Sequence, residues 1–205
     1  MATATEYPMR PETLLGINDA PTSQTTGGAT PEDLLEVSDR LMPELIDGQL
    51  VEREPMGLKA NAVAANVLFF IKGFVRPNDL GLVAGAQGSF QVFPDDPKKV
   101  RIPDASFTRW ERLPDRIVEE GHGKTAPDLI VEVISKNDRV IDVSEKVRDF
   151  LAAGTRLIWV LDPVLRAVQV YRAERPWSLL QASETLEGDD VLPGFRCLVE
   201  DLFKI

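Results

Sequence analysis

The sequence predicts an α/β domain with a mixed β-sheet flanked by helices. Three observations indicate this class. Residues 128–135 and 157–162 are short apolar runs typical of buried strands. A helical segment lies between them, and further strand-like segments come before the first run. This order, strands first and then strand–helix–strand, favours a mixed sheet.

The N-terminal segment differs in composition from the rest of the chain. Residues 1–29 are rich in Thr, Pro, Gly and Ala and show no sustained period, so we expect a flexible tail followed by one domain, 30–205. Thr30-Pro31-Glu32-Asp33 predicts a helix start, because an N-cap is followed by proline and two acids in the first turn. The helix itself is LLEVSDRLM.

The next segments alternate between strand and helix patterns. Residues 44–54 predict two short strands around a turn at Asp47-Gly48. Residues 58–75 form the longest helical pattern, which ends before Pro77. Three strands are then expected, around LVAG, SFQVF and DASFTRW, and residues 111–125 are expected to form a loop.

The C-terminal half contains the strand–helix–strand unit. After the strand 128–135, Asp142-x-x-Glu145 resembles a capping box, and Gly154 is a natural helix stop. The apolar stripe of this helix consists of Val143, Val147, Phe150 and Leu151. LIWVLD and AVQVYRA are expected to form a hairpin, and VLPGFRCLVEDLF packs as a closing segment.

Composition limits the function classes. No segment reaches the ~20 apolar residues of a membrane span, and the N-terminus lacks signal-peptide features. The single cysteine, Cys197, excludes an intramolecular disulfide, and we expect a cytoplasmic protein. The net charge of −10 argues against nucleic acid as a partner, but 12 of the 23 Lys and Arg residues lie within 98–156. From charge alone, a solvated mixed-charge surface is favoured.

Glu132 is the residue that most strongly suggests a functional site. It lies in the middle of the apolar run 128–135. On a strand, residues 130, 132 and 134 share a face, so Glu132 is flanked by Ile130 and Ile134. Burying an unpaired carboxylate costs several kcal/mol, roughly, so such a group is normally protonated, paired or bound to a metal.

Other charged residues could join Glu132. Asp104 stands at the start of another strand, Glu44 precedes a strand, and Lys146 borders the apolar stripe of the following helix. Carboxylates that converge with a lysine would suit Mg²⁺ or Mn²⁺. Each residue also has an ordinary structural interpretation: Asp104 as turn chemistry, Lys146 as a snorkelling lysine, and Glu44 as a surface acid.

Five segments, in order, resemble the Uma-two family of putative restriction endonucleases in the PD-(D/E)xK nuclease superfamily. These are PELIDGQLVE, IPDASFTRWERLP, APDLIVEVIS, EKVRDFLAAGTRLIWVLDP and VLPGF, within residues 31–205. The resemblance implies a restriction-endonuclease-like core and Mg²⁺-dependent hydrolysis of phosphodiester bonds. Asp104 matches the PD aspartate, Glu132 the acid of the next motif, and Glu44 the acid of the ELIDG segment.

The lysine of the superfamily is displaced in this sequence. Its usual place, two residues after the glutamate, is Ile134, and Lys146 matches the lysine that this family carries in the next helix. There are two departures from the family pattern: Lys59 stands near the place of a frequent histidine, and Lys136 replaces a usual proline. The only histidine, His122, lies between glycines in a loop and is assigned no role.

The leading hypothesis is a metal-dependent DNA endonuclease. Asp104 and Glu132, assisted by Glu44, would hold Mg²⁺ or Mn²⁺, and Lys146 would position or activate water. Lys136 is expected to end the strand in a turn and to point to solvent or to the DNA backbone. A homodimer is expected, because two symmetric sites cut both strands most simply. A nuclease fold that binds without turnover, and a hydrolase of another phosphate ester, are the alternatives.

Overall fold

The computed structural model describes residues 28–205 except 42 and 54. The expected tail, 1–29, lies almost entirely outside the described residues, so its flexibility stays a prediction.

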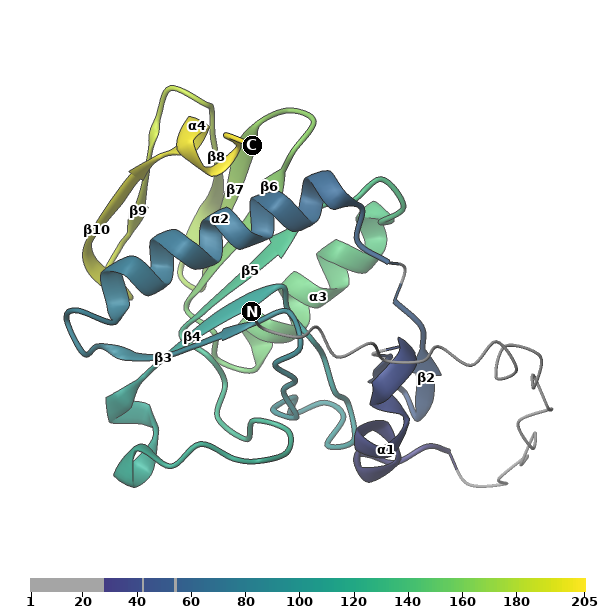
Figure 1. The fold of residues 1–205 in the computed structure, drawn as a ribbon. Helices are drawn as coiled ribbons and strands as arrows, with labels where there is room; N and C mark the ends of the chain where they lie inside the picture. The colour runs from purple at the N-terminus through teal and green to yellow at the C-terminus, as the bar shows by residue number, and fades with distance from the viewer. Residues whose placement is uncertain (1–27, 42, 54) are drawn as a thin grey trace, which may run out of the picture.

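A six-stranded mixed sheet forms the centre of the protein (Figure 1). Its strands lie in the order β3-β4-β5-β6-β7-β8, and only β5 and β6 are parallel. The expected α/β class with a mixed sheet is therefore confirmed. The strands are β3 (Gly81–Gly85), β4 (Ala105–Arg109), β5 (Leu129–Val133), β6 (Leu157–Asp162), β7 (Ala167–Arg172) and β8 (Arg175–Leu180).

Two long helices cover opposite faces of the sheet, α2 (Leu58–Val75) and α3 (Val140–Ala152) (Figure 1). Alternate residues of β5 enter two different apolar clusters, because successive strand side chains point to opposite faces. Val131 packs in the cluster that contains α2, whereas Ile130 packs with Phe150 of α3. All five residues of β5 are buried, and the parity of the strand places Glu132 on the α3 face.

Helix α2 meets the length and composition criteria for crossing a membrane, and it is the one helix within the described ranges that does so. Its residues Val63, Val67 and Ile71 are buried in the main core cluster with the sheet. An apolar helix that packs in a protein core meets the same criteria, so they are weak evidence for a membrane span.

The N-terminal elements follow the sequence closely. Helix α1 (Pro31–Leu41) begins after Thr30, whose hydroxyl accepts a hydrogen bond from the Asp33 N–H at 3.3 Å. Asp33 in turn accepts a hydrogen bond from the Thr30 N–H at 2.8 Å. These reciprocal bonds satisfy donors that a helix start leaves unpaired, so the predicted N-cap is confirmed.

A short hairpin follows α1 and is formed by β1 (Glu44–Ile46) and β2 (Gln49–Val51). Asp47 and Gly48 both have positive φ, 50° and 73°, which two-residue hairpin turns require. Leu45 exchanges two backbone hydrogen bonds with Val100, at 3.0 and 2.8 Å. The hairpin is thereby fixed beside the segment that leads into β4.

Two local predictions were wrong. Residues 89–93 do not form a strand, because only Phe90 makes isolated bridges, to Arg101 and to Gly123, before Pro94 interrupts the segment. Helix α3 begins at Val140 with Arg139 as its N-cap, so Asp142 does not cap it. The N-cap therefore lies three residues before the position that the capping pattern indicates.

The C-terminal region contains more strands than were expected. Besides β8, the strands β9 (Thr185–Gly188) and β10 (Leu192–Leu198) form a two-stranded sheet, which α4 (Val199–Leu202) follows. The expected loop 111–125 begins inside one 3₁₀ turn, Trp110–Arg112, and contains a second, Pro114–Arg116. Phe195 of β10 packs against Trp159 in the main core.

Candidate active site

Asp104 and Glu132 lie near one another where β4 begins beside β5. Asp104 is the residue before β4, whose first residue, Ala105, pairs with Val131 of β5. Asp104 and Glu132 both line the same pocket. The N–H of Asp104 donates to the Val131 carbonyl at 3.1 Å, and its Oδ2 accepts from the Val133 N–H at 2.8 Å.

Glu132 is a buried carboxylate that is only half satisfied. Its Oε2 is 3.2 Å from Lys146 Nζ, whereas its Oε1 is buried without a hydrogen-bond partner among the described residues. Burial raises the pKa of Glu132 to about 8, although the attraction of Lys146 opposes that effect. In the metal-free protein this side chain therefore carries a proton for part of the time near neutral pH.

Lys146 reaches the carboxylates from α3, as expected. Its side chain is 10% exposed, and Nζ lies 2.9 Å from Glu44 Oε1, 3.2 Å from Glu132 Oε2 and 2.9 Å from the Ile102 carbonyl. Burial alone would lower the pKa of Lys146, but the charges of Glu132 and Glu44 outweigh it, so the pKa is raised. The ammonium group therefore stays protonated and acts as a fixed positive charge.

Glu44, at the start of β1, has both carboxylate oxygens engaged. Oε1 accepts from Lys146 and from the Ile102 N–H, each at 2.9 Å, and Oε2 accepts from Arg101 Nη1 at 2.9 Å. Burial would raise the pKa of Glu44, but Lys146 and Arg101 lower it to about 2. Glu44 is thus ionised and holds Lys146 in place.

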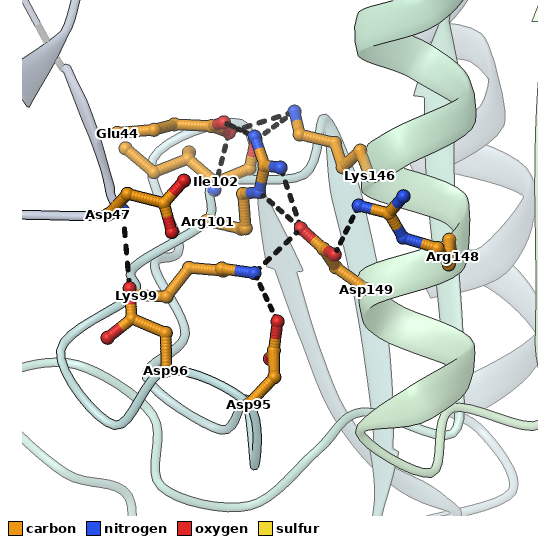
Figure 2. A network of polar contacts seen from close by, with 10 residues as sticks. All are labelled: Glu44, Asp47, Asp95, Asp96, Lys99, Arg101, Ile102, Lys146, Arg148 and Asp149. Carbon is orange, nitrogen blue, oxygen red and sulfur yellow. Dashed lines mark hydrogen bonds and ion pairs between the residues drawn. The ribbon is translucent and has the colours of Figure 1, made fainter. Parts of the chain in front are cut away.

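A buried ion-pair network extends from Glu44 to α3 (Figure 2). Arg101 links Glu44 to Asp149, whose Oδ2 accepts from Arg101 Nη2 at 2.6 Å and from Nε at 3.1 Å. Lys99 Nζ also lies 3.4 Å from the same oxygen. Sequence reasoning missed this network. The available signal was that Asp149 follows Lys146 by three residues, on the same face of the helix.

Arg53, just after β2, is a second residue that the sequence interpretation missed. Its Nη2 donates to Asp104 Oδ1 at 3.1 Å, and its side chain is 24% exposed. In the sequence it is one charge among several in LVERE, and no pattern distinguishes it from a surface arginine.

The predicted residues converge on one pocket of about 290 Å³. Lys136 lies outside its lining, in an exposed turn after β5, as expected. The buried ring of His122, to which no role was assigned, bonds Ser89 Oγ at 2.7 Å and the Pro31 carbonyl at 2.8 Å. The pocket is lined by charged residues that include Glu44, Arg53, Arg101, Asp104, Glu132, Glu145 and Lys146.

The donor set fits a hard cation with few protein ligands. Within the described part of the chain, no three Asp, Glu, His or Cys side chains form a ready-made metal cluster. Mg²⁺ does not require one, because it is usually held by one or two carboxylates together with waters and substrate phosphates. Asp104 and Glu132, whose Oε1 has no partner among the described residues, supply such carboxylate oxygens at the pocket.

The pKa of Glu132 predicts how the stability of the metal-free protein depends on pH. Its pKa is raised from 4.5 to about 8, so its stabilising contribution is complete below pH 4.5 and is lost as the pH rises through 8. Glu44 acts in the opposite sense, because its contribution is lost as the pH falls from 4.5 towards 2. The melting temperature in EDTA is therefore expected to fall between pH 5 and pH 9.

Glu132→Gln is the matched control for this dependence. Glutamine keeps the shape of the neutral acid and does not titrate, so the melting temperature of the variant should change much less over the same range. Differential scanning fluorimetry in EDTA measures both proteins. A fall of equal size in the variant would assign the dependence to other groups.

Two comparisons place the chain among known proteins. The Uma2 family, described as "Putative restriction endonuclease", matches residues 31–200. A crystal structure at 1.96 Å resolution of a putative nuclease belonging to DUF820, from Anabaena variabilis ATCC 29413, is 21% identical, with a TM-score of 0.70. The match covers 85% of this chain and 97% of that chain, and at this identity it shows the fold alone. The comparison with curated proteins gave no match. Since the family match covers most of the sequence, the chain belongs to the Uma2 family of putative restriction endonucleases.

Proposed function

We propose that this protein is a metal-dependent endonuclease that hydrolyses DNA phosphodiester bonds with Mg²⁺ or Mn²⁺. One observation carries the proposal. Glu132 Oε1 is a buried carboxylate oxygen that has no hydrogen-bond partner in the described part of the chain, and Glu132 lines a pocket together with Asp104 and Lys146. Burying such an oxygen is costly unless a ligand uses it. A divalent cation is the ligand that offsets this cost best.

Asp104 and Glu132 are the residues that would hold the cation. When bound, it would supply Lewis-acid activation of a phosphate and of a water molecule. The hydrogen bond from the Val133 N–H orients Asp104 and leaves Oδ1 directed to Arg53. Glu44 as a further metal ligand stays a prediction from the family resemblance, since both of its oxygens are hydrogen-bonded in this structure.

Lys146 supplies a permanent positive charge beside the reacting phosphate. Because its pKa is raised, it does not serve as a general base. Its ammonium group orients Glu132 and stabilises negative charge that develops as water attacks phosphorus. Glu44 positions Lys146 through the 2.9 Å ion pair.

DNA is the substrate that this family assignment favours. The net charge of −10 opposes binding over the whole surface, but just over half of the Lys and Arg residues lie in the segment 98–156, which supplies Asp104, Glu132 and Lys146. Arg139 lines the pocket, and Lys136 is exposed in the turn beside it. Two copies of the site in a homodimer would cut both strands of a duplex.

Lys146→Met is expected to reduce cleavage of plasmid DNA by about 100-fold or more, because it removes a fixed charge that stabilises the transition state. Conversion of supercoiled plasmid with Mg²⁺ or Mn²⁺ gives the rate, and the ratio of linear to nicked product shows whether paired sites act together. Melting temperature in EDTA checks that the variant is folded.

Lys136→Met is the matched control. It removes the same charge from the exposed turn, so it should at most weaken DNA binding. The slope of log binding constant against log salt concentration should then decrease by about one, as for the loss of one phosphate contact. Loss of turnover in Lys136→Met with normal turnover in Lys146→Met would reverse the assignment of the two lysines.

A second candidate is a nuclease fold that binds DNA or metal without turnover. It is favoured by the pairing of the site's charges with one another: Lys146 Nζ has three acceptors, and Arg53 engages Asp104. Mn²⁺ binding measured by calorimetry, without cleavage of DNA, RNA or small phosphate esters, would support this candidate over the first.

A further inference from the structure

Arg53 occupies the oxygen of Asp104 that a cation would need. Asp104 Oδ2 is already bound to the Val133 N–H at 2.8 Å, so Oδ1 is the oxygen that faces other partners. Arg53 Nη2 lies 3.1 Å from this Oδ1, and Asp104 is almost fully buried. Within the described ranges, Asp104 is also the one hydrogen-bond acceptor of the Arg53 side chain.

The charges of the pocket oppose simultaneous contact of Arg53 and a divalent cation with Asp104. Glu44, Glu132 and Asp104 are the acids that attract the Arg53 guanidinium, and Arg101 and Lys146 are further cations in the same pocket. A divalent cation added beside Asp104 with Arg53 still in contact would place three positive charges on one carboxylate. Like charges at such distances repel strongly when the groups around them are mostly buried, as Asp104, Arg101 and Lys146 are.

We propose that Arg53 is the internal counterion of Asp104, that a divalent cation displaces its guanidinium, and that the displaced guanidinium then binds a phosphate oxygen of the substrate. This inference rests on the proposed function and assigns to it a further substrate-binding residue. Arg53 would compete with the metal for Asp104 before the metal binds, and it would bind the substrate phosphate after the metal has bound.

The position of Arg53 suits the second role. It follows β2, so its backbone is outside the sheet while its side chain lines the pocket and stays partly exposed. A guanidinium has five N–H donors in a planar fork that matches phosphate oxygens. Release from Asp104 therefore makes donors available in the pocket where the substrate phosphate would lie.

The test compares the affinity for the metal, which should increase when Arg53 is removed, with the apparent affinity for DNA, which should decrease. Arg53→Met keeps an apolar stem and removes the charge. Mn²⁺ affinity, measured by isothermal titration calorimetry without DNA, is expected to rise by about tenfold, a size typical of coupled binding events. The KM for plasmid DNA at saturating Mn²⁺ is expected to rise as well, because a phosphate contact is lost.

Arg112 provides a matched control outside the pocket. It also pairs with a buried aspartate, Asp128, at 3.3 Å, and its side chain is 33% exposed. Arg112→Met should leave Mn²⁺ affinity and KM near the wild-type values. Arg53→Lys, which keeps the charge, should keep the wild-type Mn²⁺ affinity within about twofold. Arg53→Gln is a second neutral variant if the methionine variant does not fold in EDTA.

Each outcome decides a part of the proposal. Unchanged or weaker Mn²⁺ binding in both neutral variants would overturn the counterion role. Tighter Mn²⁺ binding with unchanged KM would overturn the phosphate role. If wild type and both neutral variants bind no Mn²⁺, the inference fails together with the proposed function. If wild type binds Mn²⁺ and cleaves DNA while the variants behave like it, only the inference fails.

Discussion

Glu132→Gln and Asp104→Asn are each expected to reduce metal-dependent DNA cleavage by about 10³-fold. Each substitution replaces a carboxylate that is proposed to hold the cation by a neutral amide of the same shape, so a bound cation would lose part of the negative charge that neutralises it. A metal ion contributes several kcal/mol to phosphate activation, and each 1.36 kcal/mol corresponds to tenfold in rate. Plasmid cleavage rates with Mg²⁺ and Mn²⁺, with Mn²⁺ binding measured by calorimetry, test both variants.

Glu145→Gln is the control for these two variants. It also removes a negative charge from the lining of the same pocket, so a general electrostatic effect would appear in it as well. We expect its cleavage rate to stay near that of wild type. Cleavage by Glu132→Gln at the wild-type rate would falsify the assignment of the metal ligands.

Asp149→Ala is expected to lower the free energy of unfolding by about 3–5 kcal/mol. Asp149 is the buried acceptor that Arg101 and Lys99 share, and both cations are themselves buried. Removing it leaves positive charge in a protein interior without its partner, which costs more than an ordinary lost contact. Thermal unfolding should show a decrease in melting temperature of about 10 °C or more.

Asp95→Ala gives the corresponding control on the surface. Asp95 also pairs with Lys99, at 2.8 Å, but its side chain is 61% exposed. Asp95 is itself exposed, and the buried Lys99 keeps Asp149 as a partner in the variant, so we expect a loss of about 0–1 kcal/mol and unfolding close to the wild-type temperature. Equal effects of the two substitutions would show that burial does not determine the strength of this network.

The sequence predicted the central elements of the fold because their signals are local. The run around Glu132 is apolar on both faces, and the helix after it has a clear stripe that includes Phe150. The strand expected at SFQVF failed for a non-local reason. Phe90 and Phe93 pack against Phe150 although they lie in a loop. Apolar side chains can thus be buried without the backbone pairing as a strand.

The candidate site divides in the same way. Glu132 was found because a carboxylate in an apolar strand is conspicuous, and Lys146 because a helix face could be read from its neighbours. Arg53 and Arg101 were missed because their partners are distant in the sequence. Arg53 is 51 residues from Asp104, and Arg101 is 57 residues from one acid partner and 48 from the other. Charge alone does not indicate which of many acids an arginine contacts.

The location of Lys146 on a helix has a consequence for how the chain tolerates insertions. A lysine at position 134 would be tied to the parity of β5, and one residue inserted after Glu132 would turn it to the other face of the sheet. The lysine on α3 is held by the docking of Val147 and Phe150 in the apolar cluster instead. The apolar contacts of the helix, rather than the number of residues after Glu132, fix the position of the ammonium group. The turn between Val133 and Val140 can therefore change length while the ammonium group stays beside Glu132.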